Sequence, residues 1–248
     1  MLAVEGPFTV ELEGGRRVDG VRVDSVADLD RAGEELEVCG HPVLVVVGGA
    51  SRMSASEVRR LAPLFDQVLA PLAQRLGATV VDGGTDTGVM RLMGAARGDS
   101  GAGFPLIGVI VEELTDDATR ASVDGVNLEP NHTHFVFVPG SEWGEEAPWL
   151  ARLATVVSGS NPSATVLVNG GEIAVEDVRH SVDAGRRVVA LDGSGRTADA
   201  LAAAIRGKRS DPELAALAAS GLVHVVDVRD RNSLAWLLDD VFSGRAPQ

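Results

Sequence analysis

The chain has 248 residues, a formal net charge of −14, 45% hydrophobic residues and one cysteine, Cys39. The negative charge argues against a nucleic-acid partner, because binding to a phosphate backbone depends on clustered lysine and arginine. A single cysteine excludes an internal disulfide, and no apolar run approaches the roughly 20 residues that a membrane helix needs; with no signal-peptide pattern at the start, we expect a soluble, cytoplasmic protein without a membrane partner.

The first forty residues are predicted to form an extension of the main domain. Between residues 7 and 24, apolar and polar residues alternate around Gly14-Gly15, which is typical of a small β-hairpin. Residues 26–37 carry apolar side chains at helical spacing and predict a helix. We expect residues 41–248 to form one α/β domain, so that 1–40 and 41–248 together make a single compact unit.

From residue 43 onward, apolar runs alternate with amphipathic segments. Continuous β-branched runs such as Val43–Val47 are typical of strands buried on both faces. The predicted strands are 43–47, 78–81, 106–111, 134–138, 164–168 and 187–191, with 223–226 as a last edge strand. The predicted helices are 54–76, 88–97, 145–157, 173–184, 197–206 and 231–242, and 112–130 is predicted to be a polar loop. This order predicts a doubly wound, mainly parallel sheet with helices on both faces.

Glycine-rich loops follow four of the predicted strands. Three of them contain glycine pairs, Gly48-Gly49, Gly83-Gly84 and Gly170-Gly171, and the fourth contains Gly193-Ser194-Gly195. Because parallel strands place their carboxyl ends at one edge, we expect these loops to converge on one cleft. Glycine lets an anion approach the backbone, and the following helix directs unpaired N–H groups at it. Any single loop could be an ordinary turn, but four at equivalent positions favour a phosphate site.

Polar residues near these loops complete the predicted binding site. The run 131–134 (Asn-His-Thr-His) directly precedes a predicted strand and is expected on the wall of the cleft, and Arg52, Arg91 and Arg196 are the nearest candidate phosphate partners. Nearby carboxylates suit ribose hydroxyls, with helix capping as the alternative. The predicted ligand-binding residues are Gly48, Gly49, Ser51, Arg52, Gly83, Gly84, Thr85, Thr87, Gly88, Asn131, His132, Thr133, His134, Gly170, Gly171, Glu172, Asp192, Gly193, Ser194, Gly195 and Arg196.

Neither a metal nor a resident cofactor is predicted. His132 and His134 would point to opposite faces of an extended segment, so they do not suit one metal ion. Trp143 and Trp149 flank an acidic helix start and are assigned to the core or to a subunit contact, with stacking on a base as the second choice. We expect Gly84→Val to block the phosphate while leaving the fold largely intact.

Four stretches of the chain carry specific motifs: residues 82–90 (DGGTDTGVM), 128–135 (LEPNHTHF), 169–171 (NGG) and 188–199 (VVALDGSGRTAD). They resemble the segments T-G-G-x-x-x-G-V-M, L-x-P-N-H-T-H-F, E-G-G and P-V-V-V-x-D-G-S-G-R-A-A-D in the N-terminal homology region of melastatin-type transient receptor potential (TRPM) channels. The chain is therefore similar, over about residues 43–205, to the prokaryotic LSDAT group of the SLOG superfamily.

This resemblance implies a Rossmann-like fold with a pocket for a nucleotide-derived ligand. ADP-ribose and its cyclic relatives are the leading candidates, and a sensing or binding role is the first hypothesis. Related proteins commonly pair through helices beside the pocket, which implies a homodimer. The apolar segment around Trp149, Leu150 and Leu153 is a candidate dimer face, although core burial would explain it equally well.

The superfamily also contains LOG-type enzymes, which cleave nucleoside monophosphates to base and ribose phosphate. Their signature P-G-G-x-G-T-x-x-E resembles residues 169–177 (NGGEIAVED), but here the Gly-Gly pair alone is kept: the proline, the third glycine and the threonine are missing, and Asp177 takes the last place. If the protein hydrolyses N-glycosidic bonds, Glu176 or Asp177 would stabilise an oxocarbenium-like transition state or activate water. A scaffold with a vestigial pocket is the third hypothesis.

Overall fold

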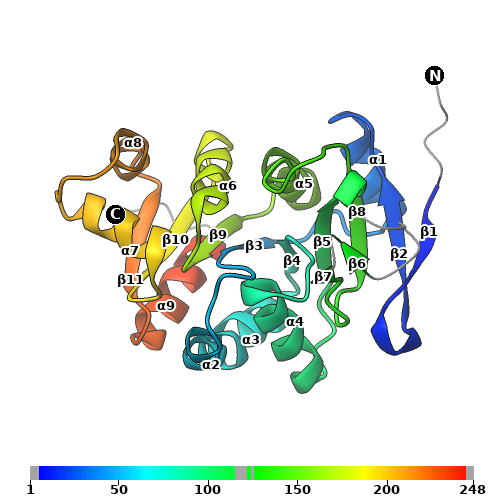
Figure 1. Cartoon of the computed structure of the whole chain (residues 1–248), viewed down its shortest axis with the longest axis horizontal. Coiled ribbons are helices and arrows are strands. Elements are labelled where there is room, and N and C mark those ends of the chain that lie inside the picture. The colour runs from blue at the N-terminus through cyan, green and yellow to red at the C-terminus, as the bar shows by residue number, and fades with distance from the viewer. Residues whose placement is uncertain (1–5, 115–121, 124–125, 244–248) are drawn as a thin grey trace.

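A central sheet organises the computed structural model, which describes residues 6–114, 122–123 and 126–243 (Figure 1). Across these residues nine strands form the sheet in the order β1-β2-β8-β5-β4-β3-β9-β10-β11. Its strands are β1 Phe8–Glu11, β2 Arg17–Arg22, β3 Val43–Gly48, β4 Thr79–Asp82, β5 Leu106–Val111, β8 His134–Val138, β9 Ser163–Val168, β10 Arg187–Asp192 and β11 Val223–Asp227. Only β1 pairs antiparallel, so the predicted mainly parallel, Rossmann-like sheet is confirmed.

The strand order reverses between β3 and β9. The chain runs from β3 outward through β4 and β5 to β8, and then returns to the other side of β3 as β9. The register pairs Val43 with Ser163 and Gly48 with Val168, so both strands end together. In an open α/β sheet, this reversal leaves a crevice at the carboxyl ends of the two strands, where ligands bind.

Helices cover both faces of the sheet (Figure 1). One face carries α2 Ala55–Leu64, α3 Ala70–Leu76, α4 Gly88–Ser100 and α9 Arg231–Phe242, and the other carries α1 Asp28–Glu35, α5 Ala147–Ser158, α6 Glu172–Asp183, α7 Arg196–Ile205 and α8 Pro212–Ala219. Successive side chains of β3 point to opposite faces of the sheet and therefore reach both cores. Val45 packs under α5 and α6, whereas Leu44 and Val46 pack under the layer formed by α2 to α4. The sheet is therefore the shared middle layer of two apolar cores.

The predicted helix 54–76 consists of three segments. It begins with the expected capping box, in which the Glu57 N–H donates to Ser54 Oγ at 3.3 Å and the Ser54 N–H donates to Glu57 Oε2 at 2.8 Å. A π-helical turn over Phe65–Leu69 then joins α2 to α3. Pro71 has no N–H to donate to the carbonyl one turn back, which explains why the regular ladder is interrupted next to this residue.

The N-terminal hairpin is confirmed and is part of the main sheet. A 3₁₀ turn over Glu13–Gly15 joins β1 to β2, and β2 pairs parallel with β8, Gly20 lying opposite Phe135. Val10, Phe135 and Phe137 belong to a third, smaller apolar cluster beneath the hairpin.

Two short strands and one helix were not predicted. Residues 122–123 and 126–127 pair as β6 Ser122–Val123 and β7 Val126–Asn127 inside the predicted loop, and α8 follows α7. A short 3₁₀ turn, Glu112–Leu114, precedes the β6–β7 pair. None of the helices in the described residues is long and apolar enough to cross a bilayer.

Candidate functional site

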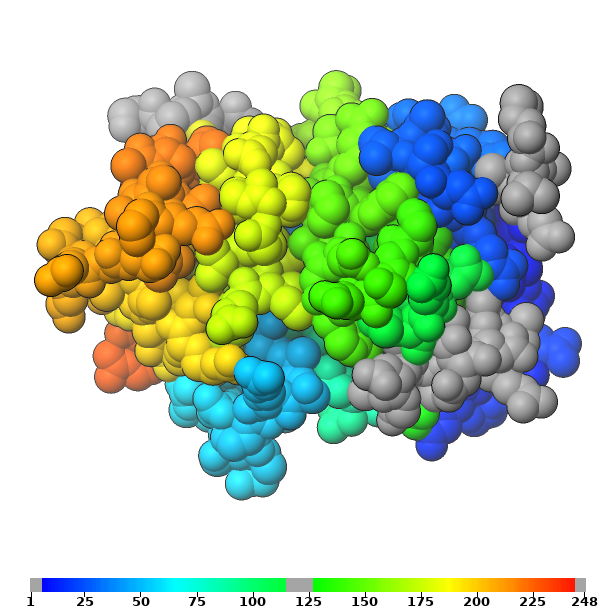
Figure 2. Space-filling model, turned by 45° about the horizontal axis from the view of Figure 1, so that its top comes forward, coloured from blue at the N-terminus to red at the C-terminus, as the bar shows by residue number. Residues whose placement is uncertain are grey.

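A cavity of about 430 Å³ opens at the point where the strand order reverses. It lies over the ends of β3 and β4 and beside the start of α6. In the space-filling view, the segments around residue 50, around residue 140 and over 170–196 adjoin one another on this face (Figure 2). Nine of the predicted ligand-binding residues line it: Gly48, Ser51, Arg52, Gly83, Thr85, Thr87, Gly171, Glu172 and Arg196. Ligand binding by these residues stays a prediction.

Groups that favour an anion meet at one end of the cavity. Helix α6 follows Gly171 directly, and no side chain caps its first N–H groups, which line the cavity over Glu172–Ala174. The Arg196 guanidinium lies beside Gly171, where a Cβ would stand 3.1 Å from Nη2. Unpaired N–H groups, the positive end of the helix dipole and a guanidinium therefore meet at one place.

The arginines of this cavity lack the partners that most other arginines of the protein have. Within the described part of the chain, neither Arg52 nor Arg196 forms an ion pair or a side-chain hydrogen bond. By contrast, Arg179 pairs with Glu176 and Arg229 pairs with Asp227. Two unpaired guanidinium groups in one cavity favour a ligand with phosphate or carboxylate oxygens.

The other side of the cavity is acidic. Asp177 lies six residues beyond Gly171, which places it roughly 9 Å further along α6. Burial, together with the negative charges of Glu146 and Glu176, raises the pKa of Asp177 to about 8. Burial also raises the pKa of Glu146, whose Oε2 accepts a hydrogen bond from the Gly144 N–H at 2.7 Å. Asp177 is half-buried and, among the described residues, has no hydrogen-bond donor.

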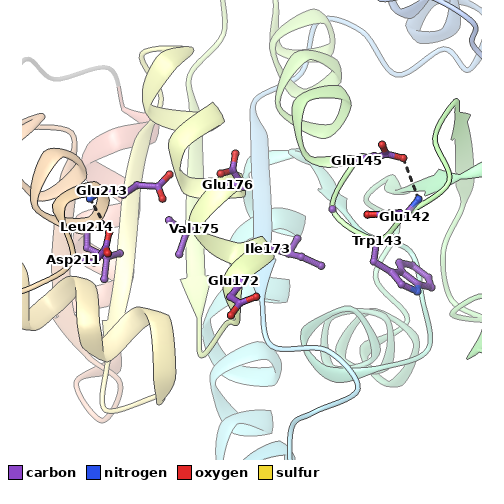
Figure 3. Close-up of a pocket in the computed structure, with 11 residues that line it drawn as sticks. Glu142, Trp143, Glu145, Glu172, Ile173, Val175, Glu176, Asp211, Glu213 and Leu214 are labelled. Carbon is purple, nitrogen blue, oxygen red and sulfur yellow. Dashed lines mark hydrogen bonds between the residues drawn. The ribbon is translucent and has the colours of Figure 1, made fainter.

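The structure separates the two carboxylates that were predicted as catalytic. Asp177 lines the cavity, whereas Glu176 forms an ion pair with Arg179 and lines a neighbouring depression of about 530 Å³. Side chains from α6, from the start of α8 and from the segment before α5 surround this depression (Figure 3). Its lining carries six carboxylates, on Glu142, Glu145, Glu172, Glu176, Asp211 and Glu213. Only Asp177 is therefore placed to act on a ligand in the cavity.

The segment 131–134, predicted on the cavity wall, lies behind the loop that follows β4. His132 is fully buried between Asp82 Oδ1 at 2.8 Å and Glu129 Oε2 at 2.9 Å. These two carboxylates overcome the cost of burial and raise the pKa of His132 to about 9. Asn131 donates its N–H and its side-chain amide to Glu129, each at 2.8 Å. The imidazolium and its partners thus tie the end of β4 to the chain that precedes β8.

The remaining members of this segment bond to strand termini. Thr133 Oγ1 accepts a hydrogen bond from the Leu106 N–H at 2.9 Å and donates to the Leu106 carbonyl at 3.0 Å. His134 Nδ1 lies 2.8 Å from Thr133 Oγ1, and burial lowers the pKa of His134. None of the four residues lines the cavity in the described structure.

The loop 192–195 is closed by the protein itself. The Asp199 carboxylate accepts hydrogen bonds from the N–H groups of Gly193 at 2.7 Å and Gly195 at 3.0 Å. Ser194 is buried, and its hydroxyl accepts from the Asn169 N–H at 2.8 Å. Asp192 forms an ion pair with Arg206. A carboxylate of the chain therefore occupies the anion position of this loop, and only Arg196 reaches the cavity.

Four other predicted glycines, Gly49, Gly84, Gly88 and Gly170, pack beneath the lining. Gly84 has a φ of +69°, and a Cβ there would stand 2.8 Å from the Gly108 Cα. The expectation that Gly84→Val leaves the fold intact is therefore wrong, because the new side chain would meet the backbone of β5 in a conformation that valine avoids.

Several lining residues were not predicted, above all Glu146 and the apolar group Val46, Val47, Ala50, Met90, Leu150, Ile173 and Ala174. Trp143 also lines the cavity and is 38% exposed; its second-choice assignment, stacking on a base, stays a prediction. Leu150 and Leu153 are buried in the core, so they are not available as a dimer face.

Comparisons with known proteins agree with this architecture. A family model described as "SLOG in TRPM, prokaryote" matches residues 41–235. Transient receptor potential cation channel subfamily M member 2 of Mus musculus is 25% identical over 199 residues, covering 64% of this chain and 13% of the channel. The member-like 2 protein of Nematostella vectensis is 27% identical over 195 residues, covering 63% and 12%. The chain therefore spans only a small part of the length of these relatives.

Proposed function

Since the chain belongs to the family SLOG in TRPM, prokaryote, we propose that its cavity binds a nucleotide-derived ligand, with ADP-ribose as the leading candidate. The phosphate groups bind at the start of α6 and the sugar and base extend toward Trp143 and Leu150. The role is binding or sensing, and no resident cofactor is required.

One observation carries this proposal: Arg196 stands unpaired beside Gly171 at an uncapped helix start. An isolated helix start binds anions weakly, and an isolated surface arginine has no preference for one ligand. Together with Arg52 and Ser51 they supply the backbone N–H groups, charges and hydroxyl that bind a pyrophosphate in water-accessible pockets.

Calorimetry with ADP-ribose, AMP and NAD⁺ tests the proposal. We expect at least one of them to bind, and Arg196→Gln to weaken that binding about 10- to 100-fold, because a hydrogen bond to a charged group contributes about 1.5–3 kcal/mol. The matched control is Arg59→Gln, which removes an exposed arginine on α2 that lies outside the cavity. Equal loss in both variants, or no binding of any of the three ligands, would contradict the proposal.

A second candidate is hydrolysis of an N-glycosidic bond, favoured by the position of Asp177. At neutral pH, a carboxyl with a pKa of about 8 retains its proton and can donate it to a departing base. Incubation with nucleoside monophosphates, followed by chromatography of the free base, tests this activity. We expect any turnover to be lost in Asp177→Asn. If a nucleotide binds and no free base is released, hydrolysis is excluded and only the binding role remains.

We further propose that the protein is a cytoplasmic homodimer that binds neither nucleic acid nor membranes. A single exposed cysteine, Cys39, and the net charge of −14 support this environment and the absence of a polyanionic partner. Light scattering at micromolar concentration tests the dimer.

A further inference from the structure

The cavity is electrically polarised along α6. Arg196 stands beside Gly171 at the start of the helix, and Asp177 lies roughly 9 Å further along the same axis. Glu146 enters from the segment before α5 and lines the same cavity. A ligand that lies along α6 therefore meets Arg196 and the helix start at one end, where Glu172 is exposed, and Asp177 and Glu146 toward the other.

The carboxylate end has no cation of its own. The charged groups that act on Asp177 are Glu146 and Glu176, and both are negative. Glu176 is held by Arg179 outside the cavity, Arg196 stands at the end with Gly171, and neither Arg52 nor Arg196 is among the charges that act on Asp177. Glu146 receives two backbone N–H groups, from Gly144 and from Glu146 itself, and the oxygens of Asp177 receive none from the described residues. Carboxylates that are gathered in this way without a partner favour a positively charged ligand group.

We propose that the natural ligand is a phosphorylated nucleotide whose base is positively charged, such as the pyridinium of an oxidised nicotinamide nucleotide, and that Asp177 and Glu146 receive this base. The inference rests on the nucleotide binding proposed above, and it favours a ligand class other than ADP-ribose, whose terminal ribose carries no charge. Trp143 lines the same cavity and supplies aromatic surface, which attracts cations and stacks on planar bases.

This arrangement couples binding to release of a proton. Without ligand, Asp177 is protonated at pH 7, because its pKa is raised to about 8. A cation beside the carboxyl favours its ionised form, lowers its pKa and displaces the proton into solvent. A neutral base of the same shape does not lower the pKa of Asp177 in this way. Proton release on binding therefore shows that the site recognises the charge of the base and not only its shape.

NAD⁺ and NADH form the matched pair for the test, because they differ by one hydride at the nicotinamide ring and hence in the charge of that ring. We expect NAD⁺ to bind at least tenfold more tightly than NADH at pH 7. Calorimetry of NAD⁺ in two buffers with different ionisation enthalpies should show that a proton is released on binding, and NADH should release none.

Substitutions test whether the carboxylates cause the preference for NAD⁺ over NADH. Asp177→Asn should reduce the NAD⁺ preference to less than threefold and abolish proton release, while NADH binds as before. The matched control, Asp183→Asn, removes an aspartate at the exposed end of the same helix and should retain both properties. Circular dichroism and thermal unfolding establish that each variant is folded. If Asp177→Asn does not fold, Glu146→Gln tests the charge preference alone: the preference for NAD⁺ should fall, while Asp177 can still release its proton.

The outcomes distinguish this inference from the proposed function. Equal binding of NAD⁺ and NADH, or binding of ADP-ribose as tight as that of NAD⁺, overturns the cationic-base inference and leaves nucleotide binding intact. A preference that survives in both carboxylate variants also overturns it. If none of NAD⁺, NADH, ADP-ribose and AMP binds, the proposed function fails as well.

Discussion

His132 shows how a single side chain fixes the loop next to the cavity. Its two ring nitrogens lie within hydrogen-bond distance of Asp82 and Glu129, and all three side chains are buried. Asp82 also accepts the Gly84 N–H at 2.7 Å. The positive charge of the imidazolium therefore compensates the negative charges of two buried carboxylates. One of these, Asp82, also fixes the turn that follows β4.

Replacement of His132 by Gln should destabilise the protein by about 3–5 kcal/mol, because removal of one member of a buried ionic cluster leaves uncompensated charge. The free energy of unfolding from urea titrations measures the loss. Thr133→Ser, which keeps the neighbouring hydroxyl, is the control and should change stability by less than about 1 kcal/mol.

The same cluster predicts a pH dependence of stability. The pKa of His132 is raised from its ordinary 6.5 to about 9, so its stabilisation is complete below pH 6.5 and is lost as the pH rises through 9. The difference in unfolding free energy between the unmodified protein and His132→Gln should therefore narrow from pH 6.5 to 9. A constant difference over this range would show that His132 is not charged in the folded protein.

The sequence identified this segment as important but could not assign its contacts. The motif around Asn131–His134 predicted ligand binding, whereas its described contacts are to Glu129, Asp82 and Leu106. Asp82 and His132 are far apart in the chain, so no local pattern indicates that they meet. Asp177 could be predicted because its place in a motif is local. Glu146 could not, since only the packing of α5 against α6 brings it to the cavity.

At the level of elements, α4 packs closely against the segment that precedes β8. Gly94 and Gly98 lie on consecutive turns of this helix, and a Cβ on Gly94 would overlap the Glu129 carboxyl. At Gly98, the nearest group is the side-chain amide of Asn131, which is half-buried. Small residues therefore let a loop with a buried carboxylate pack against the helix.

Gly94→Ala should destabilise the protein by about 1–3 kcal/mol, although alanine favours a helix over glycine by about 1 kcal/mol. The reason is that Glu129 cannot move without leaving His132. Gly98→Ala is the matched comparison, because the group in the way is the end of the half-buried Asn131 side chain, which can shift at the cost of its hydrogen bond to Glu129, and it should cost less than Gly94→Ala. Thermal and urea unfolding measure both, and a stabilised Gly94→Ala protein would refute the argument.

The strands were more predictable than the helices and loops. Runs such as Val43–Val47 are apolar at every position, and this pattern fits strands buried on both faces. Helix α8 was missed because it is short and rich in alanine, with apolar residues on most of its circumference and hence little periodicity. The β6–β7 pair has only two residues in each strand, too few for an alternating pattern.

At the scale of the whole molecule, the net charge of −14 opposes the approach of an anionic ligand, although the cavity attracts it at short range. Salt screens the long-range repulsion over a Debye length of about 10 Å at 0.1 M. We therefore expect the association rate of ADP-ribose to rise about two- to fivefold between 20 and 200 mM NaCl. Stopped-flow tryptophan fluorescence, with Trp143 at the cavity, measures this rate. Adenosine is the uncharged control, and a rate for ADP-ribose that falls with salt would contradict the expectation.

The packing of the β1–β2 hairpin against β8 limits where the chain can be truncated. The match to the family model begins at residue 41, whereas β2 supplies the neighbour of β8 and Val10 packs in the cluster with Phe135 and Phe137. A fragment cut at residue 41 would leave the N–H and C=O groups along one side of β8 without partners and would uncover two phenylalanines. Such an edge is a template on which further strands assemble. We therefore expect a fragment trimmed to the segment that matches the family to precipitate, although it would still carry every residue that lines the cavity.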